Sequence, residues 1–114
     1  MGSSTTRRAR YLLLALVTLP GVACVSLEQS APLPESLPVA KYAGTPSQLA
    51  QGRDIYITKC AACHSVEPVR KYSRAEWEQE IMPEMAEETN LSPAETAAVL
   101  AYIRTVLNSA APEA

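Results

Sequence analysis

The sequence predicts an all-α fold of three to four short helices. Three segments each begin with a hydroxyl side chain that can cap a helix, and two of them carry proline at the first helical position, where proline is well tolerated. No run of residues alternates between apolar and polar side chains as a half-buried β-strand would. We expect the three helices to form one domain, residues 46–109.

The first helix is expected over residues 46–59. Thr45 is its N-cap, and Pro46 is the first helical residue. Gly52 lies in the helix interior, where glycine costs roughly 1 kcal/mol relative to alanine, so its presence needs a reason. Gly52 and Tyr56 share one helix face, which predicts that another helix crosses closely at Gly52.

Two further helices begin with capping boxes. Residues 73–76 (Ser-Arg-Ala-Glu) open a short helix that reaches about Ile81, and residues 92–95 (Ser-Pro-Ala-Glu) open a helix to about Leu107. The last helix is the expected partner of the first at the crossing. Its apolar residues recur at helical spacing and form a core face: Ala98, Val99, Tyr102, Ile103 and Val106.

The first helix leads into a C-x-x-C-H motif at residues 60–64, which indicates covalent attachment of haem. Two cysteines three apart on a helical turn lie on one side of the backbone, so both sulfurs can reach the two vinyl groups of one porphyrin. The following His64 is the only histidine, and its imidazole can bind the iron. We therefore expect one haem c, attached through Cys60 and Cys63 and ligated by His64.

Other uses of this motif fit the sequence less well. A thioredoxin-like dithiol would follow a strand in a βαβ pattern, whereas the preceding residues are helical in character. A structural zinc ion needs four nitrogen or sulfur ligands, and the remaining cysteine, Cys24, belongs to the N-terminal signal. A disulfide between Cys60 and Cys63 would close a very tight loop and leave His64 unexplained.

Residues 1–24 have the organisation of a bacterial export signal. A start rich in arginine precedes an apolar run at residues 11–19 and a small-residue stretch that ends at Cys24. The run is well short of the ~20 residues that a spanning helix needs. The end of the segment, residues 22–24, resembles a lipoprotein signal, although Gly21 stands where a large aliphatic residue is usual.

We expect a lipid on Cys24 that anchors the mature protein on the periplasmic side of a bacterial membrane. The alternatives are cleavage that removes Cys24, which would leave a soluble periplasmic protein, and an uncleaved anchor. Haem attachment also requires export, because the thioethers form outside the cytoplasm.

Residues 25–45 are rich in proline, serine and alanine, which predicts an extended tether without a core. The domain that follows is small for a stable core, and a covalently attached haem would supply a large apolar body for the helices to pack around. Residues 110–114 are expected to form a disordered tail.

The mature chain is acidic. From Val25 onward seven Lys or Arg stand against twelve Asp or Glu, so the net charge is near −5, and half of the acids lie between Glu76 and Glu88. A solvated helix face that favours solubility explains them slightly better than a patch that steers a basic redox partner. The sign of the charge disfavours nucleic acid as a partner.

The combined pattern resembles the small monohaem class I cytochromes c over residues 47–107. The matching residues are 52–56, the motif at 60–64, and residues 91–95 running into 99–104. The resemblance implies a cytochrome c-like fold whose first and last helices cross near Gly52 and Tyr102. It also implies a low-spin haem with histidine and methionine ligands, and one-electron transfer through an exposed haem edge.

The loop after the motif departs from the larger members of that family. It is short between His64 and Trp77, and it lacks the usual Gly-Pro pair. Pro68 resembles the family's loop proline, whose carbonyl orients the iron-binding histidine; such a hydrogen bond fixes the imidazole tautomer.

Two methionines are candidates for the sixth iron ligand. Met82, followed by Pro83, looks like the Met-Pro of many class I cytochromes. Met85 fits compact relatives that have Trp, then Pro-x-Met-Ala, then Leu-Ser before the last helix, and we favour it. In a third interpretation both methionines fill an apolar core, and the iron has an open position.

The haem propionates need hydrogen-bond donors, and several follow the motif. We expect contacts from Arg70, Tyr72 and Trp77, with Lys71 and Arg74 nearby. Ordinary surface basicity explains each of these residues about equally well.

The sequence thus predicts a monohaem cytochrome c that carries single electrons between periplasmic or membrane redox partners. We expect no catalytic residues, since the one histidine is an iron ligand and no Ser/His/Asp grouping is present. The expected partners are redox proteins with a basic docking surface, and the membrane through Cys24. The alternatives are a haem-based sensor with a labile sixth ligand, and a small haem subunit of an oxidoreductase complex.

Overall fold

Helices, turns and connecting loops make up residues 26–111, the part of the chain that the computed structural model describes, and that range contains no strand. The all-α prediction is confirmed. The expected export signal with Cys24, and residues 112–114 of the expected tail, lie outside the described residues.

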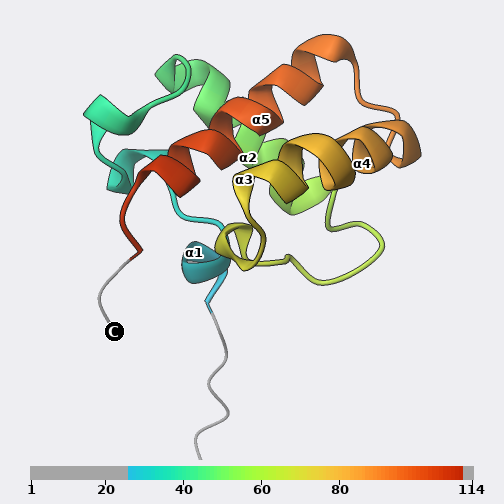
Figure 1. Cartoon of the computed structure of the whole chain (residues 1–114), viewed down its shortest axis with the longest axis horizontal. Helices are drawn as coiled ribbons and strands as arrows, with labels where there is room; N and C mark the ends of the chain where they lie inside the picture. Colours follow the sequence, from blue (N-terminus) through green and yellow to red (C-terminus); the bar gives the residue numbers. More distant parts are fainter. Residues whose placement is uncertain (1–25, 112–114) are drawn as a thin grey trace, which may run out of the picture.

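The two longest helices lie at the centre of the domain (Figure 1). The elements are, in chain order, α1 (Leu27–Ser30), the 3-10 turns η1 (Pro34–Ser36) and η2 (Val39–Lys41), α2 (Pro46–Thr58), the 3-10 turn η3 (Val69–Lys71), α3 (Arg74–Glu76), the π-helix η4 (Trp77–Ile81), α4 (Met82–Glu88) and α5 (Pro93–Asn108). None of the helices in residues 26–111 has the length and apolar character needed to cross a membrane.

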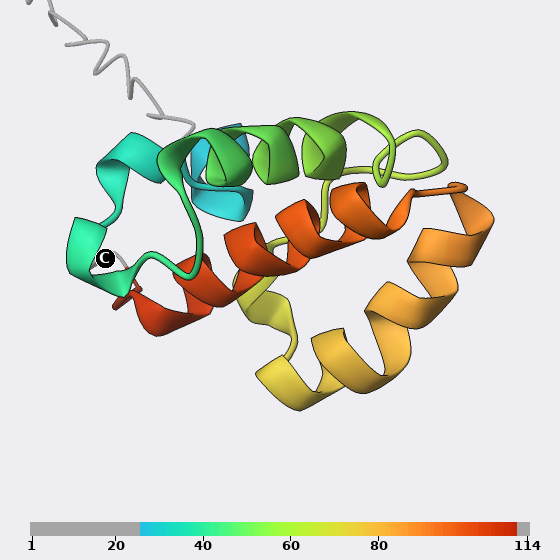
Figure 2. The same cartoon turned by 90° about the horizontal axis from the view of Figure 1, so that it is seen from above.

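α2 and α5 pack against each other (Figure 2), and they cross closely at Gly52, as the sequence predicts. A Cβ atom at Gly52 would lie 2.1 Å from the backbone oxygen of Ala98 and 2.9 Å from the Cβ of Tyr102. Only glycine therefore lets the two backbones approach this closely. Tyr102 is fully buried at the crossing.

The three predicted helix starts are confirmed. Thr45 caps α2 by accepting a hydrogen bond from the Gln48 backbone, and Ser73 and Ser92 each form a complete capping box with the glutamate three residues later. These bonds satisfy backbone donors that have no partner inside the helix.

The middle helix is longer than predicted. It does not end at Ile81 but continues through η4 into α4. The Met82 backbone donates to the carbonyl of Trp77, five residues back, and Pro83, which follows, has no N–H to donate. In an α-helix residues five apart point about 140° away from each other. The π turn instead lets both Trp77 and Met82 be buried, at 4% and 2% exposed.

Residues 26–45, which we call the N-terminal strap, are not the extended spacer that their composition predicts. The strap lies against α2 and α5, with Ala31 fully buried. The Tyr102 hydroxyl donates to the Pro32 carbonyl at 2.8 Å, and the Arg53 side chain donates to the Ala31 carbonyl at 2.9 Å. Proline limits regular structure but leaves carbonyl oxygens free, and here distant side chains bind them.

Replacing Gly52 by alanine should destabilise the domain. The new Cβ would meet the backbone of Ala98, so α2 and α5 would have to separate, and overpacking of this kind typically costs about 1–3 kcal/mol. We expect a lower free energy of unfolding in urea titrations of the full chain, even though alanine favours the helix. Gln51→Ala, at an exposed position of α2, should leave stability nearly unchanged. Equal stability of both variants would contradict the close crossing.

Candidate cofactor site

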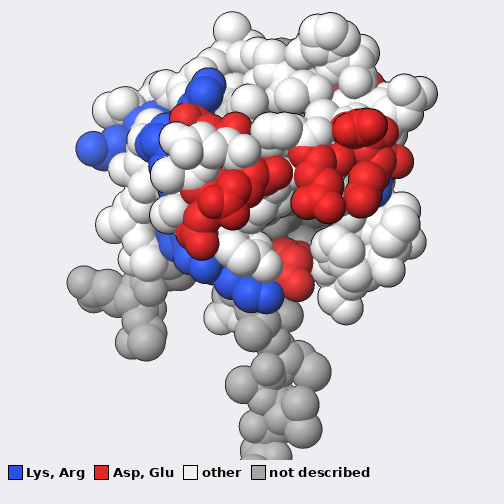
Figure 3. Space-filling model, turned by 45° about the vertical axis from the view of Figure 1, so that its right-hand side comes forward, with Lys and Arg blue, Asp and Glu red and all other residues white. Residues whose placement is uncertain are grey.

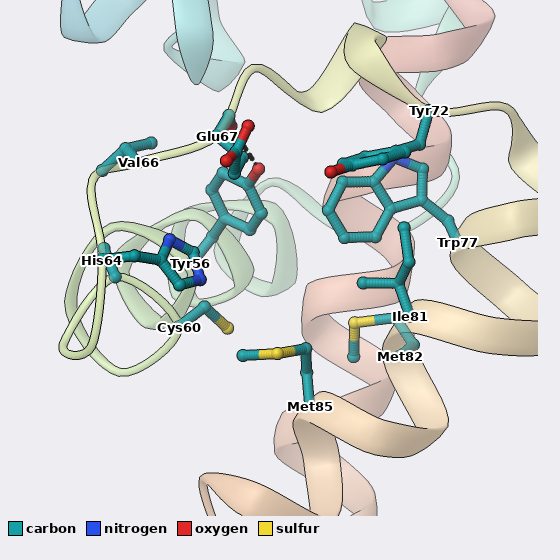
Figure 4. A pocket seen from close by; sticks show the side chains of 11 residues that line it. Tyr56, Cys60, His64, Val66, Glu67, Tyr72, Trp77, Ile81, Met82 and Met85 are labelled. Atoms are coloured by element: carbon teal, nitrogen blue, oxygen red, sulfur yellow. Dashed lines mark hydrogen bonds between the residues drawn. The ribbon is translucent and has the colours of Figure 1, made fainter.

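A mostly apolar cavity lies between the end of α2, the loop that follows it, and α4 (Figure 4). Its volume is about 230 Å³, somewhat below the roughly 300–1,000 Å³ of typical ligand sites. α2 contributes Tyr56, the motif contributes Cys60 and His64, and the middle helix contributes Trp77 and Met85.

The motif residues occupy the turn that follows α2. Cys60 is 8% exposed and lines the cavity, while Cys63 is exposed and is not part of the lining. Cys60 and Cys63 do not form a disulfide with each other. Burial raises the pKa of the Cys60 thiol above its ordinary value, and the neighbouring Lys59 opposes that shift. The structure therefore brings Cys60 and His64 to one wall and leaves Cys63 on the outside of the same turn.

His64 is exposed to solvent and lines the same wall as Cys60. Its Nδ1 atom lies 2.6 Å from the backbone oxygen of Ser65. A proton on Nδ1 donated to that oxygen leaves the lone pair of Nε2 free to bind a metal. The Pro68 carbonyl, which we expected in this role, instead accepts the backbone N–H of Lys71 at 2.9 Å in η3.

The two methionines differ in their surroundings. Met82 is buried in the core, and its sulfur is set back beside Ile81 (Figure 4). Met85 is half-buried, and its thioether extends across the cavity toward Cys60 and the side on which His64 lies (Figure 4). Only Met85 thus combines partial exposure with a position opposite the motif.

Three aromatic residues form the inner wall of the cavity. The Trp77 ring is 5.9 Å from the Tyr56 ring and 5.6 Å from the Tyr72 ring, both in edge-to-face contact. The Trp77 indole N–H donates to the Val69 carbonyl at 2.8 Å. The structure therefore places Tyr72 and Trp77 at the cavity, but the protein itself already uses the indole donor.

Arg70 is not at the cavity. Its guanidinium donates to the carbonyls of Val106 and Ala110, each at 3.1 Å, at the carboxyl end of α5. Val106 is in the last turn of α5, where the carbonyls carry partial negative charge, and Ala110 follows the end of the helix, so this end of α5 attracts the cationic side chain. Sequence position alone suggested a propionate contact and could not reveal this competing site.

Tyr56 is a site residue that the sequence did not identify as one. Its hydroxyl donates to the Glu67 carbonyl and so ties α2 to the loop that carries His64. Burial raises the pKa of this hydroxyl above its ordinary value, so it stays protonated as a donor. The shared helix face of Gly52 and Tyr56 was the available signal, but it indicated only the helix crossing.

Acidic side chains surround one side of the site. Glu78 pairs with Arg104 at 2.6 Å, and Glu76 belongs to a capping box. The other four glutamates of this stretch are exposed and form no ion pair within residues 26–111. We call these four the acidic face: Glu80, Glu84, Glu87 and Glu88. Figure 3 shows acidic side chains gathered on this side of the molecule.

The comparisons with known proteins identify no relative. No family model, no curated protein and no solved structure matches the chain. Within the described range, no three His, Cys, Asp or Glu side chains come together in a group that could hold a metal ion. A functional proposal must therefore come from the motif and from the geometry of the cavity.

Replacing Tyr56 by phenylalanine should loosen the loop after the motif. The change leaves the Glu67 carbonyl without its side-chain donor, and a hydrogen bond of this kind is worth about 1 kcal/mol. We expect faster amide hydrogen exchange in residues 61–68. Tyr42→Phe is the matched control, since it removes a tyrosine bond to the Pro34 carbonyl away from the cavity. If both variants leave exchange in this loop unchanged, Tyr56 does not hold it.

An ion pair beside the motif predicts a pH dependence of stability. Lys59 pairs with Glu95 at 2.7 Å, and the pKa of Glu95 is below its ordinary value of 4.5, first because of the Lys59 hydrogen bond. The pair therefore stabilises the fold above about pH 4.5, and this contribution is lost as the pH falls through the folded-state pKa.

Lys59→Gln should accordingly lower the melting temperature more at pH 7 than at pH 3. Lys41→Gln is the control, because Lys41 is exposed and has no ion-pair partner within the described residues. A loss that is equal at both pH values would contradict a contribution from the ion pair.

Proposed function

We propose that the protein is a monohaem cytochrome c that carries single electrons between redox partners on the periplasmic side of a bacterial membrane. The observation that carries the proposal is the arrangement of side chains around the cavity. Cys60 and His64 of the C-x-x-C-H motif lie at one wall, and the Met85 thioether extends toward them from the other.

The residues present fit a covalently attached haem. Cys60 and Cys63 would provide the thioethers, and His64 and Met85 would bind the iron, a known pair of ligands in c-type cytochromes. Apolar side chains such as Val66 and Ile81 supply walls of low polarity. The arrangement also supports a cytochrome c-like fold, since the crossing of α2 and α5 at Gly52 is the one that the resemblance implies.

The chemistry of the site requires little of the protein beyond binding and shielding. A bound haem supplies an iron that changes its charge by one unit when an electron arrives or leaves. The side chains of this chain orient the ligands and keep water from the inner wall. Glu67 is the carboxylate among the cavity-lining side chains, and it is paired with Lys71 at 2.8 Å. No residue needs to act as an acid, a base or a nucleophile, and we therefore propose no enzymatic activity.

The acidic face is the proposed docking surface for a basic redox partner. Its glutamates lie on η4 and α4, the elements that also carry Met85 and one wall of the cavity. Complementary charge raises the rate at which two proteins meet and orients them during the encounter. A lipid on Cys24 would anchor the protein to the membrane.

The sixth ligand distinguishes an electron carrier from a sensor. Met85→Ala should abolish the methionine-to-iron charge-transfer band in the optical spectrum and open the iron to carbon monoxide. Met82→Ala should keep the band but destabilise the fold by about 2–5 kcal/mol, because it removes a buried side chain from the core. Met82→Leu conserves the volume and should keep both the band and most of the stability.

Three results would change the proposal. Loss of the band in Met82→Leu, with the band retained in Met85→Ala, would make Met82 the ligand. A wild-type protein that lacks the band and binds carbon monoxide freely would be a sensor or small-ligand binder. Stable copurification with a larger oxidoreductase would make it a subunit of that complex.

A further inference from the structure

The N-terminal strap determines how far the domain can move from its anchor. The chain is held to α2 and α5 almost from its first described residues, through the carbonyls of Ala31 and Pro32. The strap is held again near its other end, where the Ala43 backbone donates to the Thr105 side chain at 2.9 Å. None of its length is therefore left to act as a flexible spacer.

We propose that the strap seats the domain directly on the membrane surface, with α1 nearest the lipid, when Cys24 carries the lipid. This inference rests on the anchored cytochrome proposed above and replaces its expected tether. Ser26 is the N-cap of α1, and its backbone N–H is bound by the Gln29 side chain at 2.9 Å. One residue, Val25, separates this cap from Cys24.

The length of free chain between Cys24 and the packed strap distinguishes a domain that rests on the membrane from one on a long tether. Two residues of extended chain span at most about 7 Å. A free proline-rich segment of the strap's length would extend by about 3.1 Å per residue, or roughly 60 Å in total. Packing of the strap thus reduces the reach of the anchor nearly tenfold and places α1 at the level of the lipid headgroups.

The surface around α1 suits this position. Leu27 of α1 is 43% exposed, which is unusual for a large apolar side chain within residues 26–111. α1 and α4, which carries most of the acidic face, lie on different sides of the domain in both views (Figures 1 and 2). The acidic face is thereby turned away from the negative charge of a phospholipid surface and stays open to a partner that reaches the membrane.

Neutron reflectometry on a supported bilayer of phosphatidylcholine and phosphatidylglycerol tests this proposal on the lipidated, full-length protein. We expect the protein layer to begin at the headgroups, with no hydrated gap. Ten Gly/Ser residues inserted between Val25 and Ser26 should open a gap of about 15 Å or more. The same ten residues inserted between Ala110 and Ala111 are the matched control and should open no gap.

A wild-type layer that already lies tens of ångströms from the headgroups would overturn the proposal. So would a layer that is identical in the wild type and in the variant with the insertion after Val25. A chain that does not bind the bilayer lacks the anchor, and this result overturns the proposal as well. The measurement does not depend on haem, which the visible absorption spectrum of the same sample reports separately, so failure of the cytochrome proposal is recognised independently.

Discussion

The close contact of α2 with α5 at Gly52 is the constraint on which the rest of the domain depends. Because no side chain separates the backbones there, Tyr102 is buried at the crossing, and its hydroxyl reaches the Pro32 carbonyl of the strap. One turn further along α2, Tyr56 packs against both Tyr102 and Trp77 and ties the motif loop in place. A single crossing thus connects the strap, the core and the cavity wall.

The middle helix provides the wall of the cavity opposite the motif. Its π turn lets Trp77 and Met82 both face inward, and Met85 then follows three residues after Met82 on the same helical face. Pro83 explains why regular α-helical hydrogen bonding does not run through this point. The wall therefore contains one methionine that fills the core and one that reaches into the cavity. This division of roles supports Met85 as the proposed iron ligand.

Local signals in the sequence predicted the helices well, because each is encoded within a few residues. Thr45, Ser73 and Ser92 cap helices whatever the rest of the chain does, and Gly52 indicates a close approach at its own position. The strap could not be predicted this way, since Pro32 is bound by a side chain 70 positions away. The predicted position of Arg70 at the haem was wrong for a similar reason, because its partners are distant carbonyls at the end of α5. The cysteines and His64 of the motif were identified from the sequence, but the position of Met85 relative to Met82 became visible only with the fold.

Covalent haem is the central claim, and peptide mass spectrometry of the exported protein tests it most directly. Digestion should release the peptide that contains Cys60, Cys63 and His64 with the added mass of one haem and with no free thiol on either cysteine. Recovery of that peptide unmodified, from protein exported by a strain that attaches haem to other cytochromes, would contradict the assignment.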